Sequence, residues 1–108
     1  MDDCNILSRL EAVIEERKGA DPASSYVAKL LQGGVPLMAR KLSEEAIETT
    51  IAALSGSEDD MLEEAADLMF HLLVLLAGKG TGLTAVCDIL AEREGLSGIE
   101  EKASREVK

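Results

Sequence analysis

Aromatic residues are nearly absent from this chain, and tryptophan is missing altogether. Its 108 residues include one tyrosine, one phenylalanine and one histidine, although 46% of all residues are hydrophobic. The interior must therefore be built from leucine, isoleucine, valine, alanine and methionine. Together with the many glutamates, this aliphatic composition favours helices over sheets.

Cysteine is also scarce, with Cys4 and Cys87 as the two copies in the chain. Two cysteines so far apart predict neither a disulfide framework nor a zinc site, because both need several clustered cysteines or histidines. We expect two free thiols in a reducing cytosol.

Positive charge is in short supply. Eleven Lys and Arg residues stand against 21 Asp and Glu residues, which gives a net charge of −10. This charge repels polyanions, so we predict no binding to nucleic acid or to the anionic face of a membrane. A small phosphorylated ligand remains compatible with it if metal ions and a few local cations offset the repulsion.

Long hydrophobic runs are missing too. The apolar run at 68–77 has about half of the roughly twenty residues needed to cross a bilayer. Asp2 and Asp3 also differ from the basic start of a signal peptide. We therefore expect a cytoplasmic protein with one domain over residues 1–108. A chain of this length buries about two-thirds or less of its unfolded surface, which favours association with a second copy.

Apolar spacing and turn residues predict an all-α fold, a bundle of four to five helices joined by short loops. The predicted helices cover residues 5–17, a segment from a cap at Ser24 or Ser25 to residue 31, residues 36–54, a segment between Ser57 and Gly78, residues 84–94, and a short stretch at 101–105. On the third helix, Ile47, Ile51 and Leu54 form an apolar arc beside the acidic residues, and we expect this arc to be buried.

Two acidic clusters on consecutive predicted helices carry most of the functional information. Glu44, Glu45 and Glu48 lie on one arc with a single nearby cation, Lys41. Like charges at this spacing destabilise a helix. A bound divalent cation would convert that repulsion into shared coordination, and carboxylates are the ligands that Mg²⁺ prefers. An ordinary solvated acidic face is the alternative reading.

The second cluster, Glu64 and Asp67, lies where the chain becomes strongly apolar. Ionised carboxylates are costly there without a counter-charge, which again favours a metal ion. His71 follows one turn later, as a neutral core histidine, a hydrogen-bond donor to these carboxylates or a ligand. Glu44 is either a metal ligand or the base that orients a water, and spacing does not separate these roles.

The acidic pattern resembles a known signature. Glu-Glu-x-x-Glu at 44–48 followed by Glu-x-x-Asp at 64–67 is similar to the metal-binding motif of the all-α, MazG-like nucleotide pyrophosphohydrolases. Longer segments resemble the phosphoribosyl-ATP pyrophosphohydrolases of histidine biosynthesis. They are Ser-Ser-Tyr at 24–26, Leu-Leu-Gln-Gly-Gly at 30–34, Glu-Ala-Ala-Asp-Leu-Met-Phe-His-Leu-Leu-Val-Leu-Leu at 64–76, and Arg-Glu-Gly-Leu-Ser-Gly-Ile-Glu-Glu-Lys-Ala-Ser-Arg at 93–105. Phe70 stands where that family usually has tyrosine, and Ser43 stands where glycine is common.

The resemblance implies Mg²⁺-dependent hydrolysis of phosphoribosyl-ATP to phosphoribosyl-AMP and pyrophosphate by a homodimer. It implies that Glu45, Glu48, Glu64 and Asp67 hold the metal, that Glu44, Glu45 and Glu48 take part in catalysis, and that Lys41, Arg93, Lys102, Arg105 and Tyr26 bind the substrate. By base rate, each of these cations is an ordinary surface charge.

Two other functions remain open from the sequence. A house-cleaning enzyme that hydrolyses non-standard nucleoside triphosphates would share the acidic motif, although the basic C-terminal tail disfavours it. A non-catalytic helical module could instead use the acidic patch to bind a basic partner. The number of metal ions, the phosphorus atom attacked and any fusion to the next pathway enzyme are not fixed by the sequence.

Overall fold

The computed structural model describes residues 5–95, and every regular element in this range is a helix. The five helices are α1 (Asn5–Glu16), α2 (Tyr26–Gly33), α3 (Val35–Ser55), α4 (Glu58–Gly78) and α5 (Leu83–Arg93). The predicted all-α fold is therefore confirmed for this range. The short helix predicted at 101–105 lies outside the described residues, as do Cys4, Lys102 and Arg105.

Short polar and glycine signals set the helix boundaries. The Ser25 hydroxyl accepts a hydrogen bond from the Ala28 amide at the start of α2. Gly34 ends that helix with a φ of 89°, in the left-handed region that favours glycine. At the start of α4, Ser57 and Asp60 form a reciprocal capping box, which pairs two amide groups that the helix itself leaves free.

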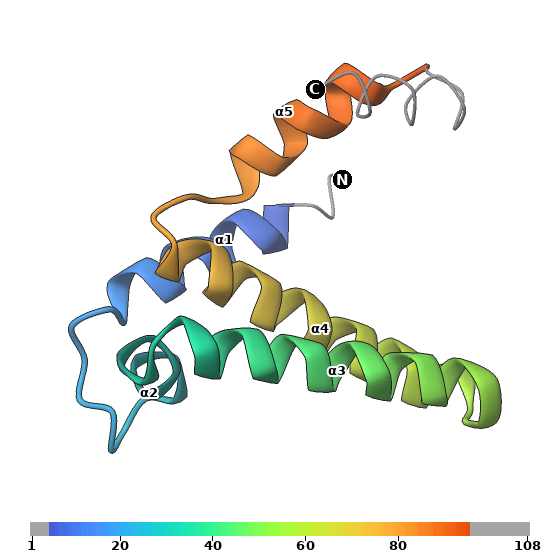
Figure 1. Cartoon of the computed structure of the whole chain (residues 1–108), viewed down its shortest axis with the longest axis horizontal. Coiled ribbons are helices and arrows are strands. Elements are labelled where there is room, and N and C mark those ends of the chain that lie inside the picture. Colours follow the sequence, from blue (N-terminus) through green and yellow to red (C-terminus); the bar gives the residue numbers. More distant parts are fainter. Residues whose placement is uncertain (1–4, 96–108) are drawn as a thin grey trace.

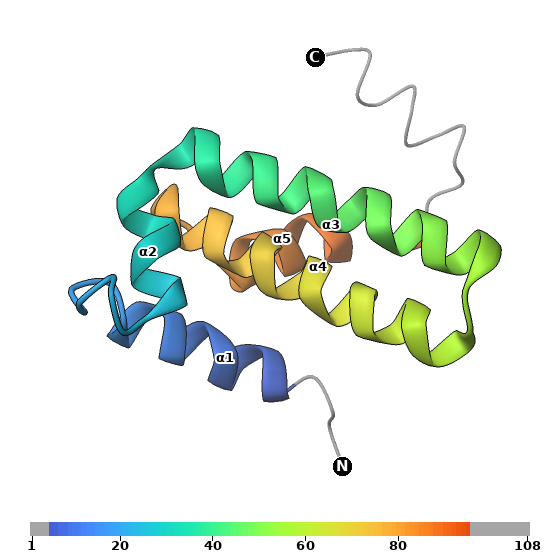
Figure 2. The same ribbon diagram turned by 90° about the horizontal axis from the view of Figure 1, so that it is seen from below.

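The long helices α3 and α4 form an antiparallel hairpin and make the most extensive helix contact in the described chain. They lie side by side in both views, with α1 along α4 and the short α2 at the end where α3 begins (Figures 1 and 2). The α5 helix points away from α3 and α4 (Figure 1). Its axis is bent by 108° from that of α4.

The hydrophobic core lies at the α2 end of the hairpin. It is made of six buried side chains from α1 to α4: Ile14, Leu30, Met38, Leu73, Val74 and Ala77. Gly78 allows α3 to approach α4 closely here, because a Cβ atom at this position would lie 2.5 Å from the Met38 Cε atom. A side chain at position 78 would therefore require the end of the Met38 side chain to move.

The apolar arc of α3 is not buried as the sequence predicted. In the single chain Ile47, Ile51 and Leu54 are 61%, 56% and 82% exposed. The helical wheel correctly placed them on one side of α3, but neither α4 nor α1 covers that side. This prediction is wrong for the isolated chain, and the arc remains an uncovered apolar surface.

The start of α5 is held by a side chain from the other end of the sequence. The Leu83 amide donates a 2.6 Å hydrogen bond to Glu11 Oε2 on α1. This carboxylate takes the place of the missing N-cap side chain of α5.

Within residues 5–95, no single helix is long and apolar enough to span a membrane. The bent pair of α4 and α5, taken together, would be long and apolar enough by length and composition only.

Candidate metal centre

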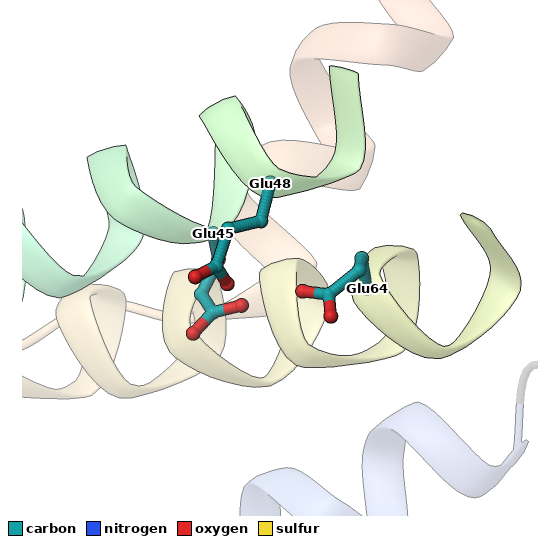
Figure 3. Close-up of side chains that lie close together, drawn as sticks. All are labelled: Glu45, Glu48 and Glu64. Carbon is teal, nitrogen blue, oxygen red and sulfur yellow. The ribbon is translucent and has the colours of Figure 1, made fainter. Parts of the chain in front are cut away.

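Three carboxylates from two helices meet between α3 and α4. Glu45, Glu48 and Glu64 each offer one oxygen atom, and these atoms all lie within 4.8 Å of one another. The side chains of Glu45 and Glu48 point from α3 toward α4, and Glu64 points back toward them (Figure 3). The two acidic clusters predicted from the sequence therefore meet in one place.

Helix geometry explains why these three meet. Glu45 and Glu48 are one turn apart, so their side chains leave α3 on the same side. The antiparallel turn at Ser55–Ser57 brings the second turn of α4, with Glu64, opposite them. Asp67 follows Glu64 by one turn on the same side of α4.

Two oxygen atoms of this cluster are shielded from solvent and unpaired. Glu45 Oε2 and Glu64 Oε2 have no hydrogen-bond partner in the described part of the chain. Buried carboxylate oxygens without a partner are costly, because burial removes the water that would solvate their charge. The arrangement therefore needs either protons or a cation between the carboxylates.

The electrostatics of the cluster show the same need. Burial is the main cause that raises the pKa of Glu45 from 4.5 to about 7, and the neighbouring Glu48 and Asp67 add to the shift. Burial and Glu48 also raise the pKa of Glu64 above its usual value. Asp67 lies close enough to contribute to both shifts, so it belongs to the same charge cluster although it is outside the group of three.

The residues present fit a hard divalent cation. They offer oxygen atoms from three or four carboxylates, which is the ligand type that Mg²⁺ and similar ions prefer. A positive ion would also pair the two unpartnered oxygens and lower the cost of ionising Glu45. A groove of about 360 Å³, lined in part by Glu48 and Glu64, opens beside the cluster toward the hairpin turn.

Glu44 lies apart from this group. Its carboxylate forms ion pairs with Lys41 Nζ at 3.3 Å and with Arg40 Nε at 3.6 Å. The expectation that Lys41 is the one nearby cation is therefore wrong, since Arg40 also faces Glu44. Both pairs are substantially solvent-exposed, so each contributes little to stability.

The remaining predicted substrate residues are scattered over the fold. Tyr26 is the first residue of α2, and its hydroxyl lies 3.0 Å from His71 Nε2 on α4. Arg93 lies in the last turn of α5, which is bent away from the hairpin (Figure 1). Lys102 and Arg105 fall outside the described residues.

The sequence left open a hydrogen bond from His71 to Asp67 or Glu64, and it missed the contact with Tyr26. Its Nδ1 atom lies 2.8 Å from the Asp67 carbonyl oxygen, and its Nε2 atom contacts Tyr26. The first contact is one helical turn away and follows from local spacing. No local signal could have found the second, because 45 residues separate Tyr26 from His71.

Comparison with known proteins identifies relatives over nearly the whole chain. The family model described as phosphoribosyl-ATP pyrophosphohydrolase matches residues 7–94. A protein of Erythrobacter litoralis named phosphoribosyl-ATP pyrophosphatase is 57% identical over 101 residues, 94% of this chain and 97% of the relative. Proteins of the same name from Novosphingobium aromaticivorans and a Caulobacter species are 53% and 55% identical, over 97% and 93% of this chain and 98% and 92% of their own.

The matched range contains α2 to α5 in full, all of α1 except its first two residues, and all four acidic residues of the charge cluster. It also contains Tyr26 and His71, so the contact between α2 and α4 lies inside it. The chain belongs to the phosphoribosyl-ATP pyrophosphohydrolase family.

Proposed function

We propose that this protein hydrolyses phosphoribosyl-ATP to phosphoribosyl-AMP and pyrophosphate with the help of Mg²⁺. The main structural support is the meeting of Glu45, Glu48 and Glu64, with two shielded oxygen atoms that lack a partner. The names of the relatives support the choice of substrate. Following the family resemblance, we assign the reaction to histidine biosynthesis and the enzyme to the cytoplasm.

The carboxylates would hold the cation in this proposal. Glu45, Glu48 and Glu64 serve as ligands from the group of three, and Asp67 joins them from the next turn of α4. When bound, Mg²⁺ supplies charge neutralisation at the phosphate oxygens and polarises the phosphorus atom. The net reaction adds one water across a phosphoanhydride bond, so one P–O bond forms and one breaks.

Cations near the cluster would bind the substrate phosphates. Lys41 lies on α3 one turn before Glu45 and is about one-third exposed. Its ion pair with Glu44 leads us to assign Glu44 to holding Lys41 in place, rather than to activating water. Arg93, Lys102 and Arg105 remain substrate residues in this proposal on the strength of the family resemblance.

Release of pyrophosphate tests the proposal directly. Purified protein with phosphoribosyl-ATP and Mg²⁺ should release pyrophosphate and no orthophosphate, and the Glu48→Gln variant should not. Running the reaction in ¹⁸O-water identifies the phosphorus atom attacked, because the label enters either phosphoribosyl-AMP or pyrophosphate. A panel of standard and non-standard nucleoside triphosphates is the comparison. Faster hydrolysis of one of these would assign the protein to house-cleaning chemistry instead.

We also propose that the functional unit is a homodimer. The support is the uncovered apolar arc of α3, where Ile47, Ile51 and Leu54 are each more than half exposed. Monomeric proteins rarely expose contiguous apolar patches of large size. A second copy that covers the α3 arc would bury these side chains and add the core that this half of the hairpin lacks.

A further inference from the structure

Three rings gather where α2 meets α4. Tyr26 and Phe70 stack with ring centroids 6.1 Å apart, and His71 meets both edge-on at 5.8 and 5.1 Å. They are the one tyrosine, the one phenylalanine and the one histidine of the chain. A sequence this poor in rings has placed all three together, beside the helix that carries Glu64 and Asp67.

The hydrogen bonds of His71 fix which ring nitrogen carries the proton. Its Nδ1 atom lies 2.8 Å from the Asp67 carbonyl oxygen, which can only accept, so Nδ1 must donate. In the neutral ring Nε2 is then an acceptor. The Tyr26 hydroxyl, 3.0 Å from Nε2, must therefore donate its proton to His71.

This arrangement limits what the Tyr26 hydroxyl can bind. Its one proton is already used, so the oxygen atom can only accept a hydrogen bond from a ligand. The Tyr26 residue is 50% exposed, whereas His71 is 6% exposed and held from both sides. An acceptor on a half-exposed side chain is thus held in a fixed orientation by a buried ring.

The position of this acceptor suits the far part of a nucleotide. His71 follows Glu64 by seven residues along α4, which corresponds to about 10 Å at 1.5 Å per residue. Glu64, Asp67 and His71 lie on one stripe of the helix, because their spacings are three and four. A ligand that has its phosphates at the carboxylates and extends along this stripe toward α2 would reach Tyr26 with its sugar or base.

We propose that Tyr26 accepts a hydrogen bond from the nucleoside part of the substrate, and that His71 is the positioning residue that makes it an acceptor. This inference rests on the proposed function and assigns a specificity contact within it. Nucleosides offer two kinds of donor, ribose hydroxyls and base amino groups. A fully ionised phosphate offers none, so Tyr26 does not bind the phosphates.

Packing of α2 does not depend on this contact. Ala28 and Leu30 of the same helix are 0% and 1% exposed, and Leu30 belongs to the hydrophobic core. The Tyr26 hydroxyl can therefore be removed without detaching α2. A role in stability and a role in binding are separable by experiment.

Kinetics of three variants test the proposal. Tyr26→Phe keeps the ring stacking and removes the hydroxyl, so KM for phosphoribosyl-ATP should rise about 3- to 10-fold, the value of one neutral hydrogen bond, while kcat changes little. His71→Asn retains a donor for Asp67 but does not reach Tyr26, so the hydroxyl loses its fixed orientation and KM should rise, by no more than in Tyr26→Phe. His71→Gln offers a carbonyl to the tyrosine and should preserve KM.

The double variant Tyr26→Phe/His71→Asn should lose no more than Tyr26→Phe alone, because His71 acts only through the hydroxyl that Tyr26→Phe already removes. An unchanged KM in Tyr26→Phe, with a loss of stability alone, would show that the contact is merely structural. Additive losses in KM would show that the two residues act separately.

Binding of AMP tests the contact without turnover, so its outcome does not depend on the proposed reaction. Tyr26→Phe should weaken AMP binding about 3- to 10-fold. IMP replaces the amino group by a carbonyl, and 2′-deoxy-AMP lacks one ribose hydroxyl. If IMP or 2′-deoxy-AMP binds the parent protein and Tyr26→Phe equally well, the group which that nucleotide lacks is the donor. If Tyr26→Phe weakens the binding of all three nucleotides equally, the donor is the 3′-hydroxyl. Equal affinity of both proteins for AMP would overturn the proposal.

Nitrogen NMR tests the tautomer. Because the chain has one histidine, its ring signals need no assignment among several residues. We expect a protonated Nδ1 and an unprotonated Nε2 in the free protein. A proton on Nε2 would reverse the Tyr26 bond and contradict the acceptor role, whether or not pyrophosphate is released.

Discussion

The two halves of the α3–α4 hairpin are built differently. In the half beside α2, which we call the core half (35–42 and 68–78), Met38 and Val74 are 2% and 0% exposed. In the acidic half (43–67), no residue is buried to that degree, and the shielded atoms include Glu45 Oε2 and Glu64 Oε2. The same pair of helices thus packs apolar groups at one end and carboxylates at the other.

This difference separates the stabilising core from the candidate metal centre along one pair of helices. The core half also contacts α1 and α2, so it supplies the apolar burial that holds the chain together. In the acidic half, burial and neighbouring like charges raise the pKa of Glu45 to about 7, which lowers the stability of the metal-free fold at neutral pH. Sites that need such groups commonly reduce stability.

Removing one carboxylate should affect activity and stability in opposite directions. Glu48→Gln should reduce pyrophosphate release by at least about 1000-fold, since even the outer partners of metal ligands are worth about 10- to 100-fold. It also removes one of the charges that raise the pKa values of Glu45 and Glu64. The metal-free variant should therefore melt at a temperature equal to or above that of the parent protein.

Glu16→Gln is the matched control for this experiment. Glu16 is exposed on α1, away from the three clustered carboxylates, and the substitution changes the charge by the same amount. It should leave pyrophosphate release unchanged. Full activity in Glu48→Gln would contradict the metal site, whatever the melting temperature.

Shortening a buried side chain in the core half should lower the free energy of unfolding much more than shortening an exposed one in the acidic half. Met38→Ala leaves a cavity among buried side chains and should lower the free energy of unfolding by about 2–5 kcal/mol. Leu54 is 82% exposed in the single chain, so Leu54→Ala should cost less than about 0.5 kcal/mol at low protein concentration. Urea unfolding at several protein concentrations measures the free energy of unfolding of both variants.

The fold could largely be predicted because its signals are local. Ser25, Gly34 and Ser57 set helix ends through contacts a few residues away, and the structure places caps at each of them. The exposure of Ile51 in the single chain could not be predicted in the same way. Periodicity shows which residues share a side of a helix, but it does not show what covers that side.

The candidate site was predictable to a similar extent. Spacing places Glu45 with Glu48 and Glu64 near Asp67, and a short hairpin turn brings the pairs together. Spacing alone did not show that Glu45, and not Glu44, would join the cluster. Adjacent residues point to different sides of a helix, and the position of the neighbouring helix decides which of the two faces it. The Tyr26 contact joins segments that no local pattern relates.

Placing a charge in the apolar arc of α3 tests whether a second copy covers it. Ile51→Lys should weaken self-association by at least about tenfold, because an unpaired charge in an apolar interface costs more than about 1.4 kcal/mol. Sedimentation velocity over a concentration series measures the change. Ala53→Lys on the same helix, where the residue is already exposed, is the control. Equal association of the two variants would place the interface elsewhere.

The acidic half should respond to pH where the core half does not. Below about pH 4.5 the Glu45 carboxyl is protonated in both folded and unfolded chains, so it does not affect stability there. Its cost to the metal-free fold develops as pH rises and is complete above about pH 7. Protons and a metal ion compete for the same oxygens, so Mg²⁺ affinity should fall as pH drops below about 7, by up to about tenfold per unit for each proton displaced.

Thermal melts with and without Mg²⁺ at pH 5.5 and pH 8 measure this competition. The rise in melting temperature caused by Mg²⁺ should be larger at pH 8, because more carboxylates are ionised and tighter binding stabilises the fold by mass action. Glu45→Gln removes the carboxyl group whose pKa is raised to about 7 and should flatten the pH dependence. A rise that is equal at both pH values would mean that Mg²⁺ binds outside this cluster. In that case the raised pKa of Glu45 would reflect burial and repulsion without a metal role.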